Sequence, residues 1–188
     1  MNVYDFDGTI YAGDSTKDFY LYCVIKYPRV LKNIPKQLIG VFKYLFKMID
    51  KKTFKEYFYS FLNKLYEPER IIQDFWKCYE SRIYSWYLYE KDENDVIISA
   101  SPEFLLEPIC KKMNIKYLVA SKVDINTGKY DGENCKGKEK VKRFNAVFGD
   151  RKIDKFYSDS LSDLPMAEKA ERAFLIKKGK VCEWHITK

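Results

Sequence analysis

The sequence predicts an α/β protein whose core is a parallel sheet between two layers of helices, with an all-α cap inserted into it. A short apolar strand at residues 2–4 runs directly into an acidic loop, and from residue 95 onward short apolar strands alternate with helical segments. Such alternation is typical of a parallel sheet covered by helices on both faces. Residues 15–90 differ in composition, with 20 of the 32 aromatic residues and a net charge of +6. We therefore expect an α/β core formed by residues 1–14 and 91–188, and a helical cap formed by residues 15–90.

The first strand ends in the segment Asp5-Phe6-Asp7-Gly8-Thr9. Two carboxylates so close together repel each other, and one of them would be protonated unless a cation or a hydrogen-bond donor neutralised it. Open α/β sheets bind ligands in the crevice beyond the carboxyl ends of their strands. The segment therefore predicts a site in which one carboxylate is a nucleophile, the other is an acid or base, and a divalent cation lies between them.

Two other structures contain the same Asp-x-Asp-Gly pattern. A calcium-binding loop begins in this way, but it needs a Glu at its twelfth position, where this chain has Thr16. Asp-Gly is also common in hairpin turns. We favour the catalytic interpretation, because the segment follows an N-terminal strand.

The cap segment predicts four helices. Ser15 and Asp18 have the spacing of a capping box, as do Thr53 and Glu56, and Pro68 suits the first turn of the last helix. The clearest amphipathic pattern lies in residues 36–49, whose apolar face comprises Leu38, Val41, Phe42, Leu45, Phe46 and Ile49. We expect the aromatic side chains to form the cap's own core and the lysines to form its solvated face.

The core resumes with a buried strand at residues 96–98, which ends in Ser99-Ala100-Ser101-Pro102. We expect Ser101 to be the N-cap of the next helix, a structural role, with Pro102 in the first turn of that helix. A further helix is predicted at residues 137–148, closed by Gly149. The remaining strands are expected at residues 116–120, 155–157 and 173–176, and near Val181.

Polar residues mark two more strand ends. Ser99 offers a hydroxyl donor beside loop amides, a combination that suits a bound phosphate. Asp159 and Asp163 follow the strand at residues 155–157. Two such aspartates on their own would be interpreted as a helix cap with solvated charge. Opposite the strand end that carries Asp-x-Asp, they instead supply the hard oxygen ligands that Mg²⁺ needs.

A lysine is expected to neutralise the nucleophile and the phosphoryl oxygens. Lys136, Lys138 and Lys140 surround the start of the helix at residues 137–148. Lys136 and Lys140 are four residues apart and could point the same way on a helix, whereas Lys138 is expected to be solvated. The spacing alone leaves Lys136 and Lys140 as alternatives.

Taken in order, these motifs resemble those of the haloacid dehalogenase superfamily, and most closely its phosphoserine-phosphatase-like branch. The resemblance rests on Asp-x-Asp-Gly-Thr at Asp5, the Ser-Ala-Ser-Pro-Glu turn at Ser99, and the Asn-Cys-x-Gly-x-x-Lys segment that ends at Lys140. It implies a Rossmann-like core with a helical cap inserted after the first motif. It favours Lys140 as the conserved lysine of the third motif, although alignment on Asn-x-Lys-Gly would select Lys136.

The resemblance also implies the role of each residue. Asp5 would form an aspartyl-phosphate, and Asp7 would handle protons. Mg²⁺ would be held by Asp5, by the backbone carbonyl of Asp7, and by Asp159 and Asp163. The substrate phosphate would be bound by Gly8, Thr9, Ser99, Ala100 and Lys136.

Two positions depart from the family pattern. The resemblance makes Asp159 and Asp163 the fourth motif of the family. Ser158 stands where a glycine usually precedes the first aspartate of that motif. Asp14 stands where phosphoserine phosphatases carry a substrate-binding Glu, so we assign it a weak role in specificity. Its shorter side chain argues against phosphoserine itself as the substrate.

The expected function is Mg²⁺-dependent hydrolysis of a small phosphorylated metabolite. The alternative substrate is a lipid phosphate, such as phosphatidylglycerophosphate, at a membrane surface. Residues 15–55 contain ten Lys or Arg and two Asp or Glu on aromatic, amphipathic helices, which could bind an anionic membrane weakly. A basic nucleic-acid-binding module is disfavoured, because it would not need acidic and hydroxyl residues at strand ends, so no nucleic acid partner is expected.

The five cysteines form no Cys-x-x-Cys pair and are odd in number. This pattern predicts reduced thiols in a cytoplasmic protein. No stretch of about 18 uncharged apolar residues is present, so no transmembrane helix is expected. A location at the membrane periphery follows only if the basic cap binds lipid.

Overall fold

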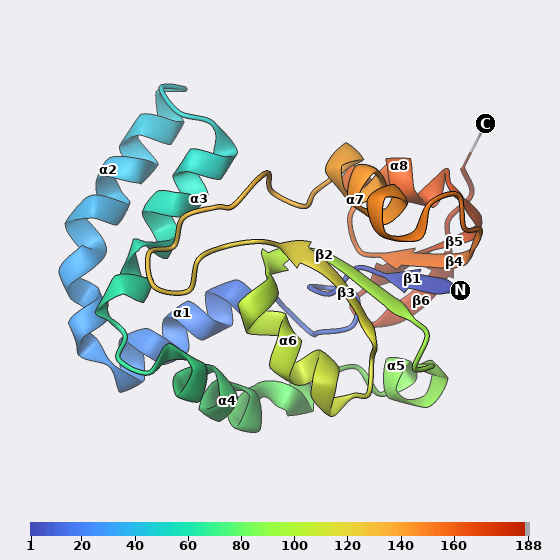
Figure 1. Ribbon diagram of the computed structural model, residues 1–188, viewed down its shortest axis with the longest axis horizontal. Helices are drawn as coiled ribbons and strands as arrows, with labels where there is room; N and C mark the ends of the chain where they lie inside the picture. The colour runs from blue at the N-terminus through green and yellow to red at the C-terminus, as the bar shows by residue number, and fades with distance from the viewer. Residues whose placement is uncertain (187–188) are drawn as a thin grey trace.

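The sheet lies in the half of the molecule that holds the N-terminus (Figure 1). The computed structural model describes residues 1–186, and its six strands have the order β3-β2-β1-β4-β5-β6. β6 is antiparallel to β5, and all other neighbouring strands are parallel. The strands are β1 (Asn2–Tyr4), β2 (Val96–Pro102), β3 (Tyr117–Ser121), β4 (Ile153–Ser158), β5 (Ala170–Lys177) and β6 (Lys180–Glu183).

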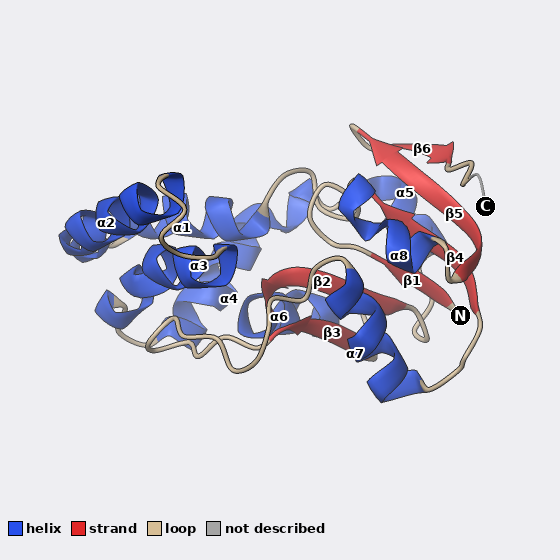
Figure 2. Cartoon of the chain, turned by 90° about the horizontal axis from the view of Figure 1, so that it is seen from above, coloured by secondary structure: helices blue, strands red, loops and turns tan. Residues whose placement is uncertain are grey.

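Helices cover both faces of this sheet, as Figure 2 shows. Val3 packs in a cluster with side chains of α7 (Lys138–Phe148) and α8 (Leu164–Ala167). Tyr4, the next residue, points to the opposite face and packs with α5 (Ser85–Glu90) and α6 (Glu103–Lys112). Successive side chains of a strand alternate between the two faces of a sheet, so both faces of β1 are buried. The predicted three-layer α/β fold is confirmed.

The elements between β1 and α5 are helical. They are α1 (Ser15–Lys26), α2 (Ile34–Leu45), α3 (Lys51–Tyr59) and α4 (Pro68–Tyr79), with short 3₁₀ segments at Pro28–Asn33, Ser60–Lys64 and Glu80–Arg82. The predicted caps of two helices are wrong. Asp14 caps α1 and Asp50 caps α3, each accepting a backbone N–H three residues later, rather than Ser15 and Thr53.

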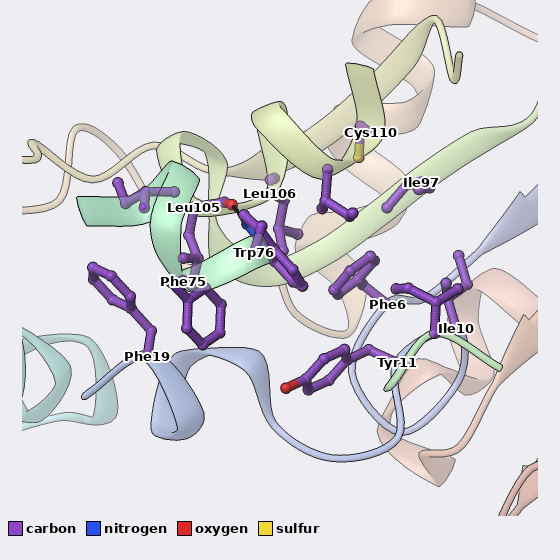
Figure 3. Close-up of a cluster of buried hydrophobic side chains, with 14 of the residues drawn as sticks. Phe6, Ile10, Tyr11, Phe19, Phe75, Trp76, Ile97, Leu105, Leu106 and Cys110 are labelled. Atoms are coloured by element: carbon purple, nitrogen blue, oxygen red, sulfur yellow. Dashed lines mark hydrogen bonds between the residues drawn. The ribbon is translucent and has the colours of Figure 1, made fainter. Parts of the chain in front are cut away.

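The hydrophobic core continues from the sheet into α1 and α4 (Figure 3). The rings of Phe6 and Trp76 meet edge to face with 5.9 Å between centroids, and those of Phe19 and Phe75 do so at 5.3 Å. Trp76 also donates its indole N–H to the carbonyl of Leu105 at 2.6 Å. Such aromatic pairs add to the free energy gained by burying apolar surface. The helices α1 and α4 are therefore fixed to the core by one shared set of buried side chains.

The helix α2 does not share in this core. Gly40 is its only buried residue, and a Cβ on Gly40 would lie 2.3 Å from the Cβ of Tyr57 in α3. The backbone of α2 therefore lies directly against α3, and its larger apolar side chains point elsewhere. The expectation that the aromatic side chains of residues 15–90 form a core of their own is wrong for Phe42 and Phe46, which are exposed together with Leu38 and Leu45.

The five cysteines are free thiols, as their number and spacing predict. No helix within residues 1–186 has both the length and the apolar character needed to cross a membrane.

Candidate active site

A cavity of about 710 Å³ lies where the carboxyl ends of β1, β2 and β4 face the helices α1 and α3. This is the position at which open α/β sheets bind ligands. Of the residues predicted for the site, only Thr9 is absent from the cavity wall. The predicted residues that line it are Asp5, Asp7, Gly8, Asp14, Ser99, Ala100, Lys136, Lys140, Asp159 and Asp163.

Lys140 forms ion pairs with Asp5 and Asp163, and these three buried side chains form the floor of the cavity. Its ammonium donates to Asp5 Oδ1 at 2.7 Å and to Asp163 Oδ2 at 2.6 Å, and all three side chains are almost fully buried. Burial alone would lower the pKa of Lys140, but Asp5 and Asp163 raise it well above its ordinary value. Burial raises the pKa of Asp5 to about 7, and Lys140 opposes that rise. The charged lysine therefore favours the ionised form of Asp5.

Asp7 lies in a different environment, although it is only two residues from Asp5. Its Oδ1 accepts the backbone N–H of Ser15 at 2.6 Å, and its Oδ2 accepts the hydroxyl of Ser101. Burial raises the pKa of Asp7 to about 6, against the effect of these hydrogen bonds. A carboxyl group with this pKa is present in both protonation states near neutral pH, which is what proton transfer in both directions requires.

Ser101 has a role that the sequence did not predict. The helix α6 begins at Glu103 and its N-cap is Pro102, so Ser101 does not cap it. Its hydroxyl instead bonds to Asp7, and its backbone N–H donates to Ser99 Oγ at 3.1 Å. The interpretation of Ser101 as a structural cap is therefore wrong. Its spacing of two residues from Ser99 in a strand was the available signal, since such residues share one face.

The loops after β1 and β4 are held together by Gly8, Thr9 and Asp159. Gly8 has φ +74°, and a Cβ added there would lie 2.1 Å from Asp159 Oδ2, so only glycine fits beside that carboxylate. Thr9 is fully buried, and its hydroxyl accepts the backbone N–H of Asp159 at 2.9 Å. Thr9 therefore positions the β4 loop rather than forming part of the cavity wall.

Asp14 and Lys136 lie at the rim of the cavity. Asp14 caps α1, pairs with Lys17 at 3.3 Å, and also lines the cavity. Lys136 is exposed, in contrast to the buried Lys140. Of the two lysines considered for the third motif, Lys140 is the one that contacts Asp5.

One wall of the cavity is formed by α3, and we call this wall the cap side. It carries lysines that were not predicted as site residues from the sequence. Lys55 of α3 donates to Asn134 Oδ1 at 2.9 Å and to the carbonyl of Ala100 at 3.1 Å. Burial, reinforced by Lys51, lowers the pKa of Lys55 to about 8. Burial and the nearby Lys136 also lower the pKa of Lys51. Nothing in the sequence distinguishes these lysines from the many that are solvated.

The donor atoms of the cavity floor fit Mg²⁺. Within residues 1–186, no three acidic, cysteine or histidine side chains are grouped closely enough to form a finished cation site. However, burial and Asp163 raise the pKa of Asp159, which indicates a carboxylate short of positive charge. The oxygens of Asp5, Asp159 and Asp163, with the backbone carbonyl of Asp7, are of the hard type that Mg²⁺ prefers.

The family assignment follows from the sequence match that accompanies this geometry. Residues 3–168 match the haloacid dehalogenase-like hydrolase family. The chain belongs to this family. The match covers most of the chain, and it confirms the resemblance read from the motifs at Asp5, Ser99, Lys140 and Asp159.

The individual proteins that this chain resembles are distant in sequence. Protein CicA of Caulobacter vibrioides is 33% identical over 92 residues, which are 45% of this chain and 41% of CicA, so the match spans less than half of that relative. A solved protein of unknown function from Bordetella pertussis Tohama I has a TM-score of 0.69 and 18% identity, covering 92% of this chain and 87% of that one. A phosphoserine phosphohydrolase-like protein from Francisella tularensis has a TM-score of 0.54 and 18% identity, covering 92% and 86%. At these identities the two structures show a shared fold.

Proposed function

We propose that the protein hydrolyses a phosphomonoester through an aspartyl-phosphate formed on Asp5. The observation that carries this proposal is the pairing of two differently tuned carboxylates in one cavity. Asp5 is held by the ammonium of Lys140, whereas Asp7 is held by a hydroxyl and a backbone N–H. Two such environments suit a nucleophile and an acid–base group respectively.

In the first step, a carboxylate oxygen of Asp5 attacks phosphorus, and the bond between phosphorus and the ester oxygen breaks. Asp7, in its protonated form, gives its proton to the leaving alcohol. Ser101 and the N–H of Ser15 hold the Asp7 carboxyl group in one orientation. Lys140 and the hydroxyl of Ser99 lie on the cavity wall, where they can stabilise the phosphoryl oxygens by charge and hydrogen bonding.

In the second step, Asp7 acts as a base. It removes a proton from a water molecule, the water oxygen attacks phosphorus, and the bond between phosphorus and Asp5 breaks. Inorganic phosphate leaves, Asp5 is again a carboxylate, and Asp7 is again protonated. Bound Mg²⁺ would offset the negative charge of the phosphoryl group on this floor.

The lysines that line the cavity outside its buried floor favour a substrate with a second negative charge. Lys51, Lys55 and Lys136 line the same cavity, and Lys55 is held by two neutral oxygens rather than by a carboxylate. A carboxylate or a second phosphate on the leaving group would offset the repulsion among these ammonium groups. We therefore infer a small, phosphorylated and further anionic metabolite as the substrate class.

Hydrolysis of an aryl phosphate with and without Mg²⁺ tests this function. We expect turnover that disappears in excess EDTA and returns when Mg²⁺ is added back. Asp159→Asn should raise the Mg²⁺ concentration needed for half-maximal activity, and Asp154→Asn, which changes an aspartate outside the cavity, should not. Undiminished turnover in EDTA would exclude the proposed role of the metal.

A further inference from the structure

The helix α2 presents a continuous apolar face to solvent. Its exposed side chains include Leu38 (62% exposed), Phe42 (58%), Leu45 (72%) and Phe46 just beyond its end (64%). Leu38, Phe42 and Leu45 have the i, i+4, i+7 spacing of one helical face. The rings of Phe42 and Phe46 lie against each other, with 4.4 Å between centroids. Ile39, Val41 and Met48 extend the exposed apolar surface, whereas the ring of Tyr44 stacks on Phe54 of α3.

This surface does not pack on another part of the described chain. The opposite side of α2 lies against α3 through Gly40 and Tyr57. Figures 1 and 2 both show α2 as the outermost helix, at the end of the molecule away from the sheet. Leaving several large apolar side chains in water costs about 25 cal/mol for each Å² of surface. Contiguous exposed patches of this kind usually mark an interaction site.

The segment that carries the apolar face is positively charged. Residues 26–55 contain nine Lys or Arg and a single acidic residue, Asp50. Lys36 and Lys47 are exposed near the two ends of α2. Lys43 is directed to the α3 side, where it donates to the hydroxyl of Tyr57 at 3.0 Å. An exposed apolar helix face rich in Phe and Leu, in a segment with an excess of Lys and Arg, is the pattern of helices that lie in a lipid interface.

We propose that the exposed face of α2 docks on a bilayer surface that contains anionic lipid. The excess of Lys and Arg in residues 26–55 favours an anionic bilayer over other partners for this face. A second copy of the chain would bring like-charged lysines together around the apolar contact, which is unfavourable. An anionic bilayer accepts the apolar side chains below its headgroups and the lysines among its phosphates.

Docking in this way would bring the cavity close to the lipid headgroups. The segment of residues 46–50 connects α2 to α3, and α3 contributes Lys51, Phe54 and Lys55 to the cavity wall. The helix that binds the membrane is therefore packed on the helix that lines the site. The inference does not depend on the proposed chemistry, since binding can be measured without turnover.

Sedimentation with lipid vesicles tests the proposal. The wild-type protein should sediment with vesicles that contain about 30% phosphatidylglycerol, and should do so less with pure phosphatidylcholine or at high salt. The double variant Phe42→Ser, Phe46→Ser should bind the anionic vesicles about tenfold less tightly or worse. The variant Lys36→Gln, Lys47→Gln should weaken the binding severalfold and reduce its dependence on salt.

Matched controls replace equally exposed residues elsewhere. Tyr66 and Tyr89 are 78% and 89% exposed, and the variant Tyr66→Ser, Tyr89→Ser should bind vesicles as the wild type does. Unchanged far-UV circular dichroism should show that each variant is folded. The proposal is overturned if the wild type does not sediment with anionic vesicles, or if the Phe42 and Phe46 variant binds them equally well. A wild-type dimer that this variant converts to a monomer, without vesicle binding, would assign the face to a second copy instead.

Discussion

The two sides of the cavity are built in opposite ways. On the floor, Asp5, Lys140 and Asp163 are buried and bonded to one another, so each of these charges has a fixed partner. On the cap side, Lys51 is exposed, and Lys55 is bonded to two neutral oxygens. Groups with fixed partners are already oriented before a ligand binds, whereas charges without one gain most from an anionic ligand. We therefore expect the floor to determine kcat and the cap side to determine KM.

The largest effect is expected at the nucleophile. Asp5→Asn should lower kcat at least about a thousandfold, because an amide is a poor nucleophile. Asp150→Asn, an exposed aspartate outside the cavity, should stay close to wild type. Mass spectrometry of enzyme trapped with substrate should find the phosphate on Asp5. A phosphate on Asp7, or full activity of Asp5→Asn, would contradict the proposed mechanism.

The next effect separates the two lysines. Lys140→Met should lower kcat about 10²- to 10³-fold, because it removes the charge that holds Asp5. It should also lower the free energy of unfolding by about 3–5 kcal/mol, since Asp5 and Asp163 would be left buried without a partner. Lys136→Met should change kcat little. Steady-state kinetics and urea unfolding measure both quantities, and the reverse ranking would assign the role of Lys140 to Lys136.

A smaller effect, which depends on the substrate, is expected at Asp7. Asp7→Asn should slow hydrolysis of an alkyl phosphate about a hundredfold and that of an aryl phosphate much less, because only the alkoxide needs a proton to leave. The pKa of Asp7 is raised to about 6, so its protonated form disappears as the pH rises through that value. The wild-type rate on the alkyl ester should therefore fall above pH 6 more steeply than the rate on the aryl ester. Equal pH profiles for the two esters would argue against Asp7 as the proton donor.

The smallest effect is expected on the cap side. Lys55→Met should raise KM about tenfold for a phosphate ester with a second anionic group. It should leave kcat unchanged, and also the KM of an aryl phosphate that has no second anionic group. Because burial lowers the pKa of Lys55 to about 8, the wild-type KM for the anionic ester should also rise as the pH increases through that value. Lys52→Met is the control, since Lys52 pairs with Glu133 and does not line the cavity. A fall in kcat on both esters would indicate that Lys55 acts on the floor.

The sequence predicted the floor better than the cap side for a physical reason. The carboxyl ends of parallel strands meet at one edge of the sheet, so residues such as Asp5, Ser99 and Asp159 could be placed together once their strands were recognised. Lys55 lies on a helix, and its approach to Ala100 depends on how α3 packs over the core, which no local pattern specifies.

The helix α2 illustrates the same limit. Its amphipathic pattern was recognised, but periodicity identifies an apolar face without saying what covers it. The predictions of the helix N-caps were wrong for a more local reason. Ser15 and Thr53 are good capping residues, yet Asp14 and Asp50 lie close by and are equally good, so the sequence offered two candidates for each start.

The pairing of β1 has a consequence for the order in which the chain folds. Val3 lies opposite Val96 in β2 and opposite Phe156 in β4, so the strand that carries Asp5 is completed only by segments synthesised much later. Contacts between residues so far apart in sequence form slowly, because long loops must close first. The helices of residues 15–90 can form local contacts while β1 still has no neighbour. A chain whose β4 has not yet left the ribosome thus carries Asp5, the proposed nucleophile, directly after an unpaired apolar strand. At this stage we expect it to depend most on protection from aggregation.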